Sequence, residues 1–137
     1  MPQWLSLLFI ILAFSFVLLF SLIYLLRPTF MPYHRQGVGI EWEQLDERVR
    51  NLILALMRAV GFAWLAWLLS CLTLLALLWR EASGPAWWTF AALFAFGLLT
   101  QALVAASFRA RTGARTPVGL ILIMAALGAA GLVLFGG

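Results

Sequence analysis

The sequence predicts an all-α membrane protein: a four-transmembrane-helix bundle with an additional amphipathic interfacial helix between spans 1 and 2. Hydrophobic residues make up 65% of the 137 residues and charged residues only 10%. A soluble domain is about half apolar and about a quarter charged, and a small one buries only about two-thirds of the surface of its chain. The apolar residues also gather into four long uncharged runs, which indicates that lipid is the solvent.

The first predicted span covers residues 5–26. At about 1.5 Å per residue, a run of this length crosses the roughly 30 Å hydrocarbon core of a bilayer. The four residues before it include no Lys or Arg, and no small-x-small cleavage site follows it. We therefore expect a retained span and not a cleaved signal peptide.

Three further spans are predicted over residues 59–79, 87–108 and 118–135, separated by short polar connections. Pro85 is placed to begin the third helix. Thr116-Pro117 is typical of a helix start, with Thr as the N-cap and Pro at the first helical position. Together the four spans are expected to form a single integral membrane domain over residues 1–137.

The long polar segment, residues 27–58, is expected to be cytoplasmic and to have two parts. Pro28 and Pro32, followed by Gly37 and Gly39, indicate an irregular or extended loop. From Ile40 the pattern becomes helical, because apolar residues recur on one face of a helix. These residues are Leu45, Val49, Leu52, Ile53 and Leu56. We expect this part to lie on the membrane surface and to run into the second span.

The basic residues predict the orientation. All nine are Arg, and eight of them belong to the first and third connections. These eight are Arg27, Arg35, Arg48, Arg50, Arg58, Arg109, Arg111 and Arg115. Since Lys and Arg favour the cytoplasmic side, both connections are expected inside and both termini outside. The aromatic residues Trp4, Trp79, Trp87 and Trp88 are expected at the outer interface.

Small residues predict how the spans pack, because lipid provides no hydrophobic force that would bring helices together. The fourth span is rich in Gly and Ala, and Ala126 and Ala130 have the small-x-x-x-small spacing. The third span offers Ala91 with Ala95 and Ala102 with Ala106. We expect these two spans to pack tightly together. The first span has mostly large side chains and is expected to face lipid.

Catalysis is not expected. The cores of the spans contain no Asp, Glu, Lys or His, which disfavours a proton-coupled transporter. No nucleophile stands beside a base, and His34, the single histidine, has no nearby partners suited to a metal site. Cys71 is expected to be an inert apolar residue. The sequence therefore predicts no catalytic residue, no metal and no cofactor, and it does not indicate nucleic-acid binding.

Six residues form the candidate site. Tyr33, His34, Arg35, Arg58, Gln101 and Arg109 are expected to converge at the cytoplasmic mouth of the bundle. Arginines at this depth suit an anionic headgroup. Simpler roles exist for several of them: Arg58 reaches the headgroups, His34 lies at the surface, and Gln101 makes an interhelical hydrogen bond. A cavity here would open toward Arg58, with Phe62, Trp64 or Trp67, and Gln101 in its lining.

Two functions are therefore expected ahead of an enzyme. The first is a small accessory, assembly or self-associating subunit, whose partner would be another membrane protein or a second copy of the chain. The second is a protein that binds or transports a lipid or small amphiphile. The lack of Lys, together with the many Ala, Leu, Gly and Trp residues, indicates a GC-rich genome. The expected location is a bacterial inner (plasma) membrane, with membrane lipids as neighbours.

Overall fold

The computed structural model describes residues 3–81 and 84–136, and this part of the chain consists of helices and short connections. The long helices are α1 (Gln3–Leu26), α3 (Glu47–Leu78), α4 (Pro85–Thr112) and α5 (Val118–Gly136). The short helix α2 (Pro32–Val38) and the 3-10 turn η1 (Trp42–Gln44) lie between α1 and α3, and the turn η2 (Trp79–Glu81) follows α3. All four long helices are long and apolar enough to cross a membrane, which confirms the predicted membrane helices.

Local sequence explains most helix ends. Pro85 stands in the first turn of α4, as predicted, where a missing N–H is no loss. Gly113 ends α4 in the left-handed conformation (φ 71°), which a residue without Cβ adopts at no steric cost. Thr116 does not cap α5 in the expected way. Its hydroxyl donates to the carbonyl of Ala105, at 2.9 Å, and so holds the α4–α5 connection against α4.

The segment between α1 and α3 differs from the prediction. The expected loop contains α2, which Pro32 begins and Gly39 ends in the left-handed conformation (φ 72°). The expected interfacial helix is not a separate element either. Asp46 caps α3 by accepting a hydrogen bond from the Arg48 amide, and α3 then continues through the polar residues and the span as one helix of 32 residues. No Pro or Gly interrupts the helix before Gly61, so nothing forces a bend.

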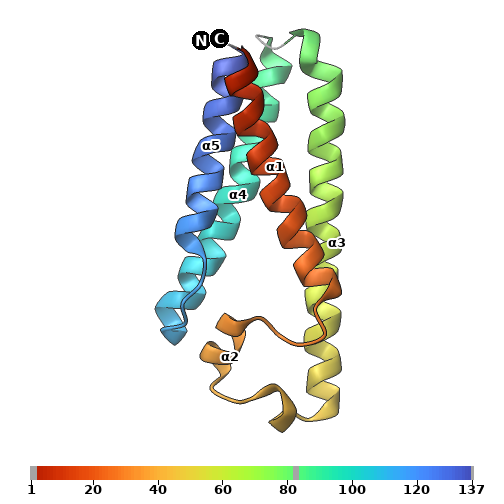
Figure 1. Cartoon of the computed structure of the whole chain (residues 1–137), viewed down its shortest axis with the longest axis vertical. Coiled ribbons are helices and arrows are strands. Elements are labelled where there is room, and N and C mark those ends of the chain that lie inside the picture. The colour runs from red at the N-terminus through yellow and green to blue at the C-terminus, as the bar shows by residue number, and fades with distance from the viewer. Residues whose placement is uncertain (1–2, 82–83, 137) are drawn as a thin grey trace.

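The long helices alternate in direction (Figure 1). Both termini therefore lie at one end of the bundle, which we call the terminal end. α2 and the α4–α5 connection lie at the opposite end, the α2 end. α3 and α4 diverge toward the α2 end, and α2 lies across the space between the diverging helices (Figure 1).

α1 is the central helix of the bundle, and the prediction that it faces lipid is wrong. It packs along both α5 and α3, and one face of it is buried. The residues of this face are Ser6, Ile10, Ala13, Val17, Ser21 and Tyr24. Their spacing of three or four is that of a single helical stripe. The expected packing of α4 against α5 is confirmed.

Glycines bring the helices close at three crossings. A Cβ on Gly131 of α5 would lie 2.8 Å from the carbonyl oxygen of Ser6 in α1. A Cβ on Gly61 of α3 would lie 3.0 Å from the carbonyl oxygen of Ser21. On Gly128 it would meet the ring of Phe94 at 2.3 Å. Because contact between membrane helices depends on such close approach, these glycines fix how α1, α3, α4 and α5 fit together.

The main core fills the terminal half of the bundle and includes Trp87, which was expected at the interface. Trp87 is 0% exposed, and its indole N–H donates to the carbonyl of Leu132 at 3.1 Å. Phe90, Phe94 and Leu98 continue the buried face of α4. A second, smaller core of Tyr24, Phe30 and Met57 lies at the α2 end. Between the two cores the helices leave open space.

Candidate functional site

Two adjoining cavities lie in this open space. The smaller, of about 140 Å³, is bounded by α1, α2, α4, α5 and the α4–α5 connection. The larger, of about 350 Å³, is bounded by α1, α2, α3 and α4. Five residues line both of them: Tyr24, His34, Gln101, Val104 and Phe108. We call the two cavities together the cleft.

The wall of the cleft is mostly apolar and aromatic. Phe20 and Ile121 close the smaller cavity, while Phe30 and Met57 form part of the larger one. The larger cavity opens sideways between α3 and α4, because Leu56 and Val104 in its lining are 58% and 63% exposed. An opening at this position faces lipid if the long helices span a membrane, so an apolar chain can enter from the bilayer.

α2 closes the cleft at its own end and is held on both sides. On the α1 side, the hydroxyl of Tyr33 forms a short hydrogen bond with the hydroxyl of Tyr24. On the α4 side, the ring of His34 packs edge-on against Phe108, with 6.1 Å between the ring centres. Gln36 accepts a hydrogen bond from the backbone N–H of Arg115 at 2.8 Å. Three anchors from distant parts of the chain therefore place Tyr33 and His34 at the cleft.

Several polar groups at the cleft retain unused hydrogen-bonding capacity. The imidazole of His34 and the amide of Gln101 form no hydrogen bond to any residue that the structure describes. The Tyr24–Tyr33 hydrogen bond uses only one of two phenolic hydrogens, which leaves the other for a ligand or water. The cleft thus combines an apolar wall with a few polar groups, as small-molecule sites commonly do.

Tyr33 and His34, the two titratable residues of α2 that line the cleft, are uncharged near neutral pH. Burial and, next, the hydrogen bond with Tyr24 raise the pKa of Tyr33 far above its usual range. Burial lowers the pKa of His34 below its ordinary value, because the imidazolium form is poorly solvated there. The ligand-facing surface of α2 therefore offers neutral hydrogen-bond donors and acceptors.

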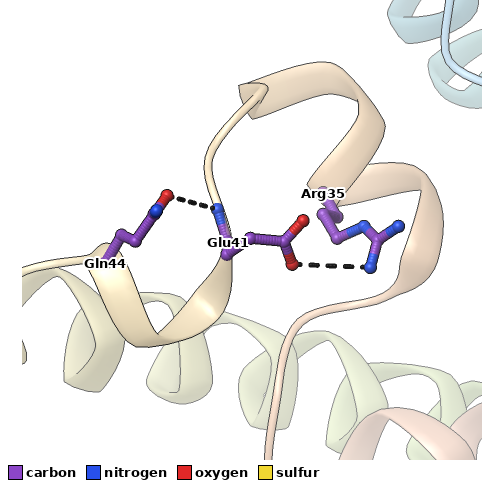
Figure 2. A network of polar contacts seen from close by, with 3 residues as sticks. All are labelled: Arg35, Glu41 and Gln44. Atoms are coloured by element: carbon purple, nitrogen blue, oxygen red, sulfur yellow. Dashed lines mark hydrogen bonds and ion pairs between the residues drawn. The ribbon is translucent and has the colours of Figure 1, made fainter.

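Three of the six candidate residues, Tyr33, His34 and Gln101, come together at the cleft. The other three do not line it. Arg35 pairs with Glu41 at 3.4 Å, in the segment that follows α2, and Gln44 accepts from the Glu41 amide (Figure 2). Arg58 and Arg109 are exposed. The arginines were expected at the mouth because the sequence predicts how deep a residue lies in the membrane. It does not predict whether the side chain points toward the cleft or away from it.

The expected aromatic lining is partly present. Trp64 and Trp67 line a neighbouring pocket between α3 and α4, together with Gln101, while Phe62 is 62% exposed and lines none of these cavities. Tyr24 and Phe108 were missed. The signal for Tyr24 was its place on the stripe of Ser6, Ala13 and Ser21, where small and polar residues recur on one face of an apolar helix.

No family model, no curated protein and no solved structure matches this chain. The functional argument therefore depends on the cleft itself. Among the described residues, no group of three or more His, Cys, Asp or Glu is placed to hold a metal ion.

Proposed function

We propose that this protein is a non-catalytic membrane protein that binds a lipid or another small amphiphile in the cleft. The observation that carries the proposal is the pairing of an aromatic, laterally open cavity of about 350 Å³ with the unpaired polar groups of His34, on α2, and Gln101, on α4. An amphiphile has the same division, with an apolar tail beside a polar head. The tail would leave through the opening between α3 and α4.

The proposal includes an orientation. The eight arginines of the two connections at the α2 end would face the cytoplasm. The polar first turns of α3 would then lie in the headgroup region, where their apolar face contacts lipid. In this orientation Tyr33 and His34, at the α2 end of the cleft, would lie near the cytoplasmic headgroups, at the depth that a lipid head occupies.

Blocking the opening tests the proposal. Val104→Trp should fill the mouth of the cleft and reduce binding of oleoyl amphiphiles at least tenfold. Leu103→Trp is the matched control, because Leu103 is the preceding residue of α4, is similarly exposed (69% against 63% for Val104) and does not line the cleft. Both variants and the unaltered protein would be purified in mild detergent and titrated with 1-monooleoylglycerol and 1-oleoyl-lysophosphatidic acid by native mass spectrometry. Absence of saturable binding of both lipids to the unaltered protein would reject the proposal.

A second candidate function is a self-associating or accessory subunit of a membrane complex. Its support is the outer surface of α5, where Ala126 is exposed and a Cβ on Gly119 would meet nothing within 4 Å. Small residues left on a lipid-facing surface allow another helix to approach closely. Cross-linking in native membranes distinguishes the two candidates: a subunit gives a defined higher-mass species that Ala126→Ile abolishes.

A further inference from the structure

Charge is absent from the lining of the cleft among the residues that the structure describes. Both cavities are lined by aromatic and aliphatic side chains together with Tyr, His, Gln and Thr, and by no Arg, Lys, Asp or Glu. An anionic head placed there would lose its water without gaining a cation, which is a large cost in an apolar surrounding. The lining therefore disfavours phosphate and carboxylate heads.

Arg27 and Arg35, two basic residues close to or within α2, form their contacts outside the cleft. Arg27 donates from Nε to the carbonyl of Phe30 at 3.2 Å. Arg27 and Arg35 line a different pocket, which also contains Glu41 and Glu43. Carboxylates thus accompany the positive charge on that side of α2, and neither arginine lines the cleft, although Arg27 is close enough to Tyr33 to oppose the rise in its pKa.

Neutral polar groups are positioned to bind a head instead. Gln101 lines both cavities of the cleft and the neighbouring pocket toward Trp67. Its amide is therefore exposed to a ligand in any of the three. His34 lines both cavities from α2. The amide and the imidazole each supply one acceptor and at least one donor, and the tyrosine pair supplies one more O–H. Hydroxyl groups of a ligand can serve both the donors and the acceptors among these groups, and carbonyl oxygens can serve the donors.

We propose that the cleft selects amphiphiles with an uncharged, hydrogen-bonding head, such as the hydroxyl and ester oxygens of a monoglyceride, over amphiphiles with an anionic head. This inference rests on the proposed function and specifies its ligand class. It replaces the expectation that the arginines bind an anionic headgroup.

The test compares two lipids that share one oleoyl chain. In the titrations described above, 1-monooleoylglycerol should bind at least tenfold more tightly than 1-oleoyl-lysophosphatidic acid. Gln101→Leu, which keeps the size of the side chain but removes its hydrogen bonds, should weaken monooleoylglycerol binding about tenfold. Arg58→Gln and Arg109→Gln are the controls and should leave it within twofold. Gln101→Arg should reverse the preference by placing a cation in the cleft.

The outcomes separate this inference from the proposed function. If neither lipid binds, the proposed function fails and this inference fails with it. If lysophosphatidic acid binds as tightly or more tightly, the cleft still binds amphiphiles but the inference is overturned, and a loss of that binding in Arg58→Gln or Arg109→Gln would assign it to the arginines. If a Gln101 variant does not fold, as judged by size-exclusion chromatography, the two affinities of the unaltered protein still decide the question.

Discussion

Trp87 and Trp88 are neighbours in the chain but have different surroundings. Trp87 is 0% exposed and donates to Leu132, whereas Trp88 is 42% exposed. Both residues match the aromatic belt of a membrane interface by position alone, and only the direction of the side chain separates them. A tryptophan at the end of a span can therefore belong to the protein core instead of the lipid interface.

Trp87→Phe should destabilise the protein by about 1–3 kcal/mol, because it removes a buried hydrogen bond and part of a packed ring. Trp88→Phe is the adjacent control and should change the stability by less than about 0.5 kcal/mol. Thermal unfolding in detergent, followed by size-exclusion fluorescence, measures both variants. Equal losses for the two would show that Trp87 is no more important to the core than an exposed ring.

His34 should make stability depend on pH. Its pKa is lowered in the folded protein by burial, so the unfolded chain takes up a proton more readily. Stability should therefore be highest above about pH 6.5, the ordinary value of histidine, and should fall as the pH drops below it. The fall ends below the pKa of the folded state, where both states are protonated.

The measurement is the unfolding midpoint between pH 8 and pH 5, for the unaltered protein and for His34→Gln. The variant should lack the part of the fall that begins near pH 6.5. A midpoint that rises as the pH decreases would contradict the direction of the pKa shift, and identical curves for both proteins would assign the pH dependence to other groups.

Helix α1 shows how an element can be apolar on all sides and still have one buried face. Its buried stripe carries Ser6, Ala13 and Ser21, and its other faces carry larger apolar residues. Two glycines, Gly61 on α3 and Gly131 on α5, approach its backbone. The central position of α1 thus comes from the small residues of its own stripe and of its partners.

Gly131→Ala should destabilise the bundle by about 1–3 kcal/mol, since its new methyl group meets the Ser6 carbonyl oxygen at 2.8 Å and backbone does not move aside easily. Gly119→Ala, in the same helix, is the control. It has open space around the new Cβ, and alanine favours helix by up to about 1 kcal/mol over glycine. Unfolding midpoints should therefore move in opposite directions, and a common direction would refute the assigned α1–α5 contact.

At the scale of the whole molecule, most of the charged residues lie toward the α2 end. Four alternating helices bring the first and third connections to the α2 end (Figure 1), and eight of the nine arginines belong to these connections and the adjoining turns of the helices. Because the bias is large, the orientation should not depend on any single arginine.

A reporter fused to the C-terminus tests the orientation. Alkaline phosphatase should be active there and green fluorescent protein dark, because the proposed location is outside the cytoplasm. A fusion made within residues 109–115 should behave in the opposite way and serves as the control. A fluorescent C-terminal fusion would place the terminal end in the cytoplasm and would reverse the proposed orientation, although the cleft would be unchanged.

The sequence by itself determined the number and position of the membrane helices. Each apolar run produced one long helix, and Pro85 stands at the beginning of α4 as predicted. These features are local, because hydropathy and helix starts depend on neighbouring residues. Tyr33, His34 and Gln101 were among the predicted site residues and line the cleft, since polar residues beside apolar spans are few, but their role in binding stays a prediction. The polar first turns of α3 were predicted to be helical and to run into the span, but a separate interfacial helix was also expected, and the structure instead has one helix, Glu47–Leu78.

Only the tertiary structure decided which face of each helix is buried and where the cleft lies. Lipid and protein interior are both apolar, so hydropathy cannot distinguish a face that meets lipid from one that meets another helix. For this reason α1 was misplaced and Tyr24 was overlooked. The position of α2 depends on Tyr24, Phe108 and the Arg115 amide, which are distant in the chain. Whether arginines or neutral side chains line the cleft follows from those long-range contacts and not from spacing.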